Sequence, residues 1–203
     1  KVVQHLVDAV ESNGNKLTTG FLGTPYICLV LSDNGRSDVA YKLFLQTEYP
    51  SWLFPVRQGA TTMWERWNSY TVKNGFGPVS MNSFNHYAYG AIEEWMMSHS
   101  LGIQRDEKNP GYKHIILQPE IGEELDYVKG GFESTQGYIA SCWEKKSKGY
   151  VYRVTVPCNT TATLFLPAVK LADVKLLKGK EGTSFISYKK GKVQYGLKSG
   201  TYE

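Results

Sequence analysis

The feature that most constrains the fold of this chain is a change in hydrophobic periodicity near residue 110. Before that point, apolar residues recur every three or four positions, which is typical of amphipathic helices. After it, short segments alternate apolar and polar residues between turn signals, which is typical of strands. The 203 residues suit one large domain or two small ones. The change of period therefore predicts a helical part followed by a β-rich part.

The first part predicts five helices joined by short loops. The first is indicated by an apolar face made of Val3, Leu6, Val7 and Val10. The other four are expected from Thr24–Pro25 to Asp33, from Ser37–Asp38 onward, from about Thr61–Thr62, and from about Asn85 to Gly102. Thr and Pro at a start and Gly just after an end are helix-boundary signals. Short connections of this kind favour antiparallel helical hairpins.

The second part predicts seven short strands, at residues 112–118, 137–145, 150–157, 161–167, 174–178, 184–190 and 192–197. Turn-forming pairs such as Lys148–Gly149 and Lys190–Gly191 separate them. Strands spaced by ~8–12 residues are typical of an antiparallel β-sandwich. The polar segment 105–111 contains Pro110 and marks the expected boundary. The predicted domains are therefore residues 1–109 and residues 110–203.

Charge and composition exclude several classes of partner. The chain carries 23 Lys and Arg against 19 Asp and Glu, a net charge of +4, and its excess lysines are scattered through turns. Counterion displacement needs clustered cations, so no nucleic-acid partner is indicated. No charge-free apolar stretch of ~18 residues exists, so no membrane span is predicted. The amphipathic start carries Asp8 and Glu11, which are foreign to a signal peptide.

Cysteine and histidine usage predicts neither a disulfide framework nor a metal site. Three cysteines are too few for a disulfide scaffold. Cys28 and Cys142 fall in apolar segments, which is typical of unreactive core thiols, while a Cys142–Cys158 disulfide across neighbouring strands stays open. The four histidines form no Cys/His pair at ligand spacing, so no metal and no other cofactor are expected. Motifs for phosphate loops, dinucleotide binding and a serine nucleophile are absent.

Three segments at expected loop-to-helix junctions, residues 17–26, 49–70 and 80–90, are rich in aromatic and polar side chains. Such junctions carry function more often than helix interiors do. Aromatic rings stack on the C–H-rich faces of sugars, and polar groups around them bind hydroxyls. The same composition also fits ordinary core packing, so composition alone leaves both interpretations open.

Glu65 and His86 each have two interpretations from the local sequence. Thr62 and Glu65 have the T-x-x-E spacing of a capping box, in which the glutamate folds back onto the start of a helix. A carboxylate in a first helical turn is also kept ionised by the helix dipole, as a general base requires. His86 suits either a helix cap or a hydroxyl-binding site among amides and aromatic rings.

A series of ordered motifs runs along the chain: TGFLGTPY, LSDNGRSDVAYKL, YPSWLFPVRQGATTMWERWNSY, MNSFNHYAYGAIEEWM and GYKHIILQPEIG. Together they resemble the α-L-rhamnosidases of glycoside hydrolase family 78. The pieces GATTMWERW and NSFNHYAYG are the most specific. The later NTTATLFLP and the closing SGTYE look like the carboxyl-terminal β-sandwich of that family. The resemblance spans essentially the whole chain.

The resemblance implies a fold and a reaction. Residues 1–109 would be the closing part of an (α/α)6 barrel, and the sandwich would follow it. Members of the family release terminal α-L-rhamnose from glycosides and polysaccharides with inversion, which requires an acid and a base ~6.5–9.5 Å apart. The base motif of the family falls on Glu65. Trp64 would line the sugar pocket, and His86 would contact the rhamnose.

The general acid of the family has no counterpart in this sequence. It lies in earlier barrel helices, and Asp33, Asp38 and Glu48 do not match its motif. The five expected helices compare with twelve in a closed barrel. The resemblance therefore implies a fragment that carries the base, lacks the upstream part of its polypeptide and is inactive alone. Barrel faces left without partners favour self-association.

Two other classes of function stay open. The aromatic segments also fit a non-catalytic carbohydrate-binding or scaffolding piece. The helical hairpins also fit a related (α/α)6 glycosidase that acts on another sugar. The sequence does not indicate a cellular compartment.

Overall fold

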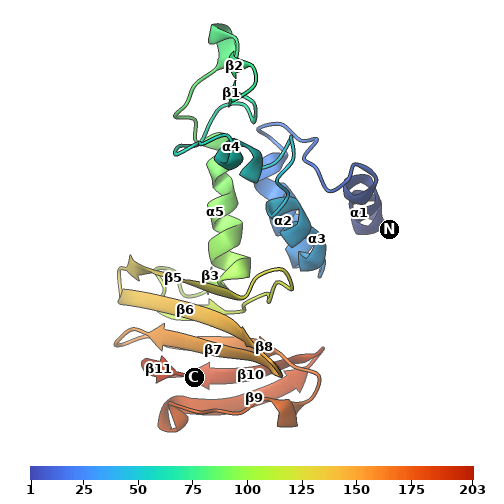
Figure 1. The fold of residues 1–203 in the computed structure, drawn as a ribbon. Helices are drawn as coiled ribbons and strands as arrows, with labels where there is room; N and C mark the ends of the chain where they lie inside the picture. The colour runs from blue at the N-terminus through green and yellow to red at the C-terminus, as the bar shows by residue number, and fades with distance from the viewer. The chain divides into compact units, whose positions relative to one another are not determined.

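Helices fill the first half of the chain and strands the second, as the change of period predicts (Figure 1). The structure is a computed structural model that describes all residues, 1–203. It contains two compact units, Lys1–Trp95 and Met96–Glu203. The polar segment 105–111 lies within the second unit. The domain limits at residues 1–109 and 110–203 stay a prediction.

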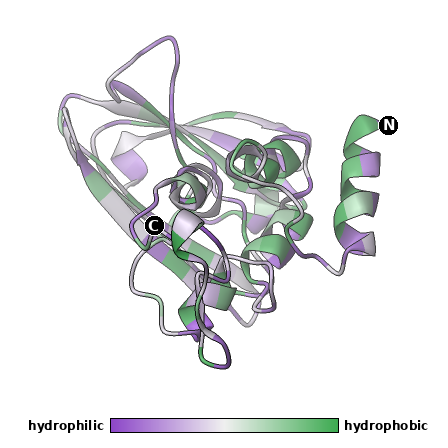
Figure 2. Cartoon of the chain, turned by 90° about the horizontal axis from the view of Figure 1, so that it is seen from above, coloured by the Kyte–Doolittle hydropathy of each residue, from purple (hydrophilic) through white to green (hydrophobic).

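The first three predicted helices are confirmed as α1 (Val2–Ser12), α2 (Thr24–Asp33) and α3 (Ser37–Phe44). Along α1, the predicted apolar face turns inward, with Val7 and Val10 buried. The helix carries apolar and polar residues side by side, which is the amphipathic pattern seen in the sequence (Figure 2). Hydrophobic periodicity therefore located these helices correctly.

Helices α2 and α3 form a hairpin around a glycine turn (Figure 1). Gly35 adopts a left-handed φ of +74°, and the amide of Arg36 donates to the carbonyl of Leu31 at 2.8 Å. This closure satisfies a carbonyl that the end of α2 would leave free. Between the helices, the Cys28 thiol lies 3.8 Å from the carbonyl of Ala40. Burial raises the pKa of Cys28 to about 12, as expected of an unreactive core thiol.

Trp95 is the central side chain of the helical unit. It closes α5 (Ile92–Trp95) and is fully buried. Its indole N–H donates to the Ser32 hydroxyl on α2 at 2.8 Å. Its ring meets Tyr41 edge to face at a centroid distance of 5.0 Å and Phe44 at 5.4 Å. One side chain therefore ties α5 to both helices of the hairpin.

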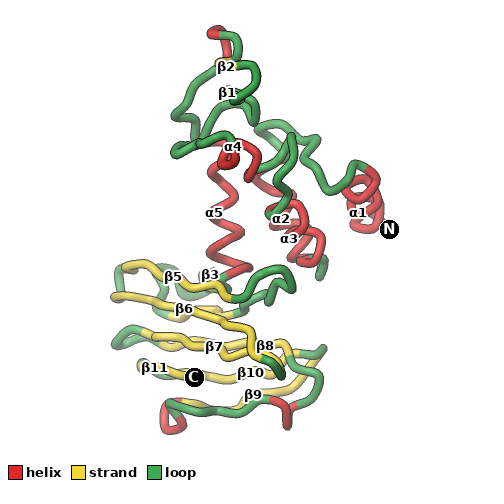
Figure 3. The backbone as a smooth tube through the Cα atoms, viewed as in Figure 1, coloured by secondary structure: helices red, strands yellow, loops and turns green.

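The helix predicted from Thr61–Thr62 is wrong. A short helix, α4 (Leu53–Arg57), lies earlier and ends before Gly59, whose φ is +92°. Residues 60–69 then follow an irregular path, and the strands β1 (Tyr70–Thr71) and β2 (Gly75–Phe76) form a small antiparallel pair. Figure 3 shows this region as mostly loop. Aromatic burial, described below, holds these residues in place of a helical hydrogen-bond ladder.

The last predicted helix begins three residues later than expected. A 3₁₀ turn at Ala88–Ala91 leads into α5, and a π-helical turn, η3 (Met96–Ser100), continues the chain. Gly102, where the helix was expected to end, has a left-handed φ of +82°. Residues 85–87 are therefore free to present side chains from irregular backbone.

The second unit is a sandwich of two sheets, which confirms the predicted architecture (Figure 1). One sheet has the order β3-β4-β8-β10-β9, from strands Ile103–Arg105, His114–Leu117, Thr161–Pro167, Lys192–Leu197 and Thr183–Lys189. The other has the order β11-β7-β6-β5, from strands Gly200–Tyr202, Gly149–Val156, Gly137–Lys146 and Tyr127–Ser134. Alternate residues of both sheets meet in one apolar core, of which Trp143, Ile139 and Ile115 are fully buried.

The sandwich departs from the sequence prediction at three points. Strand β4 pairs with β8 in parallel, whereas every other pair is antiparallel. Residues 174–178 are not a strand, because the amides of Leu177 and Lys178 donate to the carbonyl of Glu203 outside any ladder. Strands β3, β5 and β11 were not predicted. The Cys142–Cys158 disulfide left open by the sequence is not formed, since all three cysteines are free.

We expect Ser32→Ala to destabilise the chain. The substitution removes the acceptor of the buried Trp95 N–H, and an unsatisfied buried donor costs about 1–3 kcal/mol. Urea unfolding followed by tryptophan fluorescence measures the change in the free energy of unfolding. Ser80→Ala, at an exposed serine, is the matched control. Equal unfolding midpoints for the two variants would show that the indole bond contributes nothing.

Candidate functional site

Two loop segments of the helical unit, residues 63–65 and 82–86, are joined by backbone hydrogen bonds. The amide of Glu65 donates to the carbonyl of Ser83 at 2.9 Å. The amide of His86 donates to the carbonyl of Met63, also at 2.9 Å. Two of the predicted site residues, 21 positions apart in the sequence, are therefore held in one place by pairing of their backbones.

The Glu65 carboxylate is fixed by one of its two oxygens. Its Oε2 accepts a hydrogen bond of 2.8 Å from the amide of Ser83. Its Oε1 has no hydrogen-bond partner within the chain. The capping-box interpretation is wrong, because no helix follows Thr62 and the carboxylate bonds an amide 18 residues away. A half-buried carboxylate with one held and one open oxygen has the arrangement that proton acceptance requires.

Asn82 fastens the loop that holds this carboxylate. Its side-chain amide donates to the carbonyl of Ser69 at 3.1 Å and to that of Gly77 at 3.3 Å. The amide of Gly77 also donates to Ser69, at 2.8 Å. The Asn82 side chain therefore closes the loop that contains β1 and β2. This closure lies immediately before Ser83, whose amide bonds Glu65.

His86 stacks with two aromatic rings. It stacks on Phe21 at a centroid distance of 4.8 Å and on Tyr87 at 5.6 Å, with interplanar angles of 19° and 2°. Its Nδ1 accepts the amide of Ala88 at 3.4 Å. Accepting at Nδ1 assigns the proton of a neutral ring to Nε2. The histidine thus satisfies the first amide of the 3₁₀ turn and offers an N–H for a hydroxyl oxygen, so its two interpretations are compatible.

Next to His86, aromatic side chains of the junction segments form a continuous cluster. Phe21 contacts Tyr89 at 5.1 Å, and Tyr89 stacks on Trp67 at 3.7 Å and 13°. The indole N–H of Trp52 donates to the carbonyl of Tyr89 at 3.0 Å, and burial raises the pKa of the Tyr89 hydroxyl. These inner rings are core, as the second interpretation of the composition predicts. His86 is a partly exposed member of the same cluster.

Trp64 is buried, with 6% of its surface exposed. Its ring meets Phe84 edge to face at 5.3 Å and Tyr70 at 6.4 Å. It thereby anchors the segment that carries Glu65 against the segment that carries Ser83. A role for Trp64 in lining a sugar pocket stays a prediction.

The segment 17–26 is shaped by two threonines. The Thr24 hydroxyl donates to the carbonyl of Thr19 at 3.0 Å, and the two hydroxyls lie 2.8 Å apart. Thr24 is therefore the first residue of α2 and not its predicted cap, which is Gly23. This bond closes the turn that carries Phe21 beneath His86.

No group of three or more His, Cys, Asp or Glu side chains is arranged to hold a metal ion. None of the helices combines the length and the apolar composition that crossing a bilayer requires. The paired loops present a carboxylate (Glu65), an imidazole (His86) and aromatic rings.

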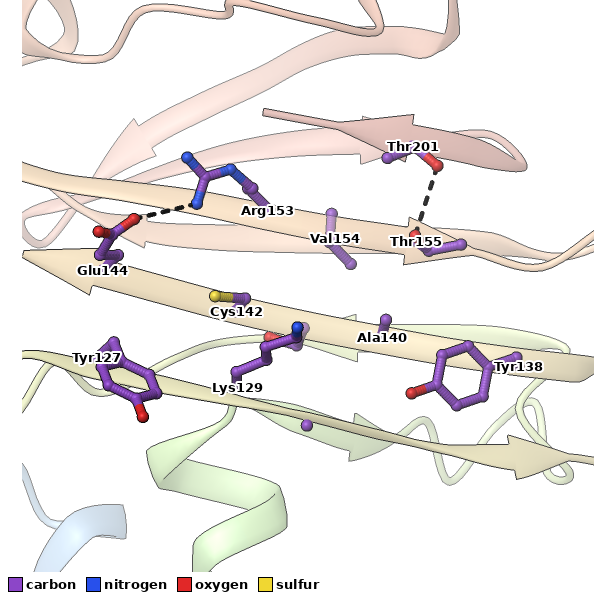
Figure 4. Close-up of a pocket in the computed structure, with 12 residues that line it drawn as sticks. Tyr127, Lys129, Tyr138, Ala140, Cys142, Glu144, Arg153, Val154, Thr155 and Thr201 are labelled. Atoms are coloured by element: carbon purple, nitrogen blue, oxygen red, sulfur yellow. Dashed lines mark hydrogen bonds and ion pairs between the residues drawn. The ribbon is translucent and has the colours of Figure 1, made fainter.

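The structure also reveals features that the sequence did not single out. Ser83 and Asn82 act through a backbone amide and a side-chain tether, and only their place in the NSFNHYAYG neighbourhood could have drawn attention to them. A hollow of about 750 Å³ lies on the open face of the four-stranded sheet (Figure 4). It contains none of the predicted site residues.

Sequence comparisons divide the chain into two family matches. Residues 1–100 match the bacterial alpha-L-rhamnosidase 6 hairpin glycosidase domain, and residues 102–181 match the bacterial alpha-L-rhamnosidase C-terminal domain. An alpha-L-rhamnosidase of Formosa agariphila is 40% identical over 205 residues, covering 98% of this chain and 22% of that protein. One of Streptomyces avermitilis is 44% identical over 163 residues, covering 80% of this chain and 16% of that protein.

Solved structures agree with the sequence matches. The crystal structure of Streptomyces avermitilis alpha-L-rhamnosidase complexed with L-rhamnose superposes with a TM-score of 0.89 at 38% identity, covering 98% of this chain and 19% of that one. The Aspergillus terreus enzyme superposes with a TM-score of 0.82 at 32% identity, covering 98% and 20%. These matches confirm the predicted fold class. The chain spans about a fifth of the length of these relatives.

We expect Asn82→Ala to loosen the clamp on Glu65. Loss of the two side-chain bonds frees the loop before Ser83, so the amides of Glu65 and Ser83 should open more often. Hydrogen exchange at these two amides is the measurement, and each net hydrogen bond lost is worth about 1 kcal/mol, or roughly fivefold in opening. Asn85→Ala, at an exposed asparagine of the same loop, is the control. Unchanged exchange rates in Asn82→Ala would disprove the tether.

Proposed function

Since this chain belongs to the bacterial α-L-rhamnosidase family, we propose that it supplies the general base of an inverting glycoside hydrolase. The substrate is a glycoside or polysaccharide with a terminal α-L-rhamnose. Because the chain spans about a fifth of its relatives, the activity belongs to a longer polypeptide that contains the upstream barrel helices. The general acid comes from that upstream part.

The observation that carries the proposal is the unequal environment of the two Glu65 oxygens. The Ser83 amide bonds Oε2 and fixes the plane of the carboxylate, while Oε1 stays open to accept a proton. A water on Oε1 loses its proton to the carboxylate as its oxygen bonds the anomeric carbon. The bond from that carbon to the leaving oxygen breaks on the opposite face, and the acid protonates the leaving oxygen. Attack opposite the leaving group inverts the configuration.

His86 is the proposed sugar-binding partner of this base. Because its Nδ1 already accepts the Ala88 amide, its Nε2–H is left to donate to a hydroxyl oxygen of the sugar. Its stacking contacts with Phe21 and Tyr87 restrict rotation of the ring. Trp64 is proposed to support one wall of the sugar pocket, because it anchors the loop that carries Glu65. The site thus holds the sugar while the water is activated.

We place residues 1–109 at the closing end of the (α/α)6 barrel and residues 110–203 in the carboxyl-terminal sandwich. Apolar side chains on the outer face of α2 and the turn before it support a partner in the helical part. Leu22, Tyr26 and Val30 are 89%, 63% and 41% exposed. Upstream helices would cover this face in the longer polypeptide, and self-association would cover it in the isolated chain.

Glu65→Gln tests the base in a polypeptide that joins this chain to the upstream barrel helices of a relative. The amide keeps the shape and the Ser83 bond but accepts no proton, so we expect kcat on an aryl α-L-rhamnoside to fall about 10²–10⁴-fold with little change in KM. Glu93→Gln, at an exposed glutamate of α5, is the matched control. A near-normal kcat in Glu65→Gln would refute the assignment of the base.

The 203-residue chain alone should show no measurable hydrolysis of the same aryl α-L-rhamnoside, because it lacks the acid. Product release followed by absorbance measures this, and light scattering on the same preparation measures the self-association proposed above. Turnover well above the background would show that a second carboxyl group of this chain serves as the acid. A strictly monomeric chain at high concentration would contradict the covered-face proposal.

A further inference from the structure

The hollow on the four-stranded sheet is a trough along the β5–β6 hairpin (Figure 4). Its floor includes the small outward-facing side chains of Ala140 and Cys142 and the backbone of Gly130, whose own Cβ position faces Leu101 in the core. Side chains of this size leave the backbone ladder close to the surface. The bulkier residues of the hollow stand around this floor, so an elongated space is left along the strands.

A tyrosine stands near each end of the trough. Tyr127 on β5 pairs with Glu144 on β6, and Tyr138 on β6 pairs with Glu133 on β5. The pairing separates the two tyrosine positions by six residues of β6, which is roughly 20 Å at the rise of a strand. The side chains are 64% and 49% exposed. Two open rings this far apart suit an extended ligand with several flat units.

The position of the Tyr138 ring depends on a missing side chain. The ring extends from β6 toward β5 (Figure 4), and a Cβ at Gly131 would lie 3.0 Å from its hydroxyl oxygen. The same Cβ would lie 2.2 Å from the carbonyl of Ile139. Glycine at position 131 therefore lets the ring reach across the neighbouring strand while much of its surface stays open to solvent.

The trough contains one cation without a counter-charge. Glu144 bonds both Lys146 and Arg153, and Arg153 also bonds Glu203 at 2.9 Å. The two cations hold the pKa of Glu144 below its ordinary value, so this cluster stays ionised and internally balanced. Lys129, which lies between the two tyrosines in Figure 4, has no ion-pair partner in the chain.

We propose that this trough is a second glycan-binding site, which takes an oligosaccharide bearing a carboxylate. Sugar rings stack on Tyr127 and Tyr138, and the carboxylate of a unit between them pairs with Lys129. The hydroxyls of Thr155 and Thr201, 3.4 Å apart at the far side of the trough, are available for sugar hydroxyls. The choice of a rhamnose-containing glycan as ligand rests on the proposed function. The site itself lies wholly in the second unit and requires no catalytic residue.

Charge and polarity favour a glycan at this face over a second copy of the chain or another protein. A symmetric contact with a second copy, centred on the trough, would bring the unpaired Lys129 side chains of the two copies close together. A protein partner of ordinary composition would need a larger apolar centre than this floor provides. An acidic sugar chain matches the aromatic ends, the single cation and the hydroxyl groups together.

The test is isothermal titration calorimetry on the 203-residue chain with oligosaccharides of alternating rhamnose and galacturonate. The same oligosaccharides after carboxyl reduction are the neutral control. We expect saturable binding that is roughly three- to fivefold tighter for the acidic form at low salt. Lys129→Gln should abolish this preference, whereas Lys148→Gln, at an exposed lysine outside the trough, should keep it. Tyr138→Ala should weaken binding of both forms by about tenfold, and Tyr138→Phe, which keeps the ring, should not.

Absence of saturable binding by the unaltered chain would overturn the proposal. So would an equal effect of Lys129→Gln and Lys148→Gln, or dissociation of a dimer by Tyr138→Ala in sedimentation, which would assign the face to a second copy. The outcome is separable from the proposed reaction, because Glu65→Gln should leave this binding intact. Glycan binding at the trough together with near-normal activity of Glu65→Gln would refute only the assignment of Glu65 as base. No glycan binding together with loss of activity in Glu65→Gln would refute only the trough proposal.

Discussion

Burial of Trp95 is the constraint on which the helical unit depends. Its indole is enclosed by the α2–α3 hairpin and can be enclosed only if its N–H finds an acceptor, which Ser32 supplies at 2.8 Å. The bond fixes where α5 lies against α2. Because α5 continues the 3₁₀ turn that begins at Ala88, it also fixes the turn and the ring of His86 before it. Packing of Trp95 in the core thus determines the position of His86, because only a short helical segment separates the two residues.

The position of Glu65, the proposed base, is specified by contacts that are distant in sequence. Glu65 lies in irregular backbone, where Ser83 gives its amide an acceptor and its carboxylate a donor. Trp64 and Asn82 hold the two loops from opposite sides. A helix would have oriented this carboxylate through local hydrogen bonds alone. Loop pairing orients it through side chains that are buried only when the whole unit is folded, so proper placement of the base requires an intact fold.

The sequence predicted elements wherever local rules decide them. The apolar face of α1, the glycine stop of α2 and the alternation of β6 all follow from spacing within one segment. The T-x-x-E spacing at Thr62 wrongly favoured a helix start, because burial of Trp64 against residues distant in sequence outweighed the local capping preference. Strand β5 was missed because Gly130 and Gly131 interrupt its alternation. The parallel pairing of β4 with β8 joins segments 47 residues apart, and no local pattern encodes it. Local sequence drew attention to Glu65 and His86, the resemblance gave Glu65, Trp64 and His86 their expected roles, and Ser83 emerged only from the fold.

The two proposed sites differ in what they need from the rest of the chain. The spacing of the two tyrosines in the trough is set within one hairpin, since pairing of β5 with β6 fixes their positions and places Gly131 next to the ring of Tyr138. The Glu65 site needs closure of loops that are themselves anchored on a helical core with an exposed α2 face. The trough is therefore expected to form even where the loops that position Glu65 are incompletely closed. The proposed glycan binding at the trough would then persist to a greater degree of unfolding than the arrangement proposed for the base at Glu65.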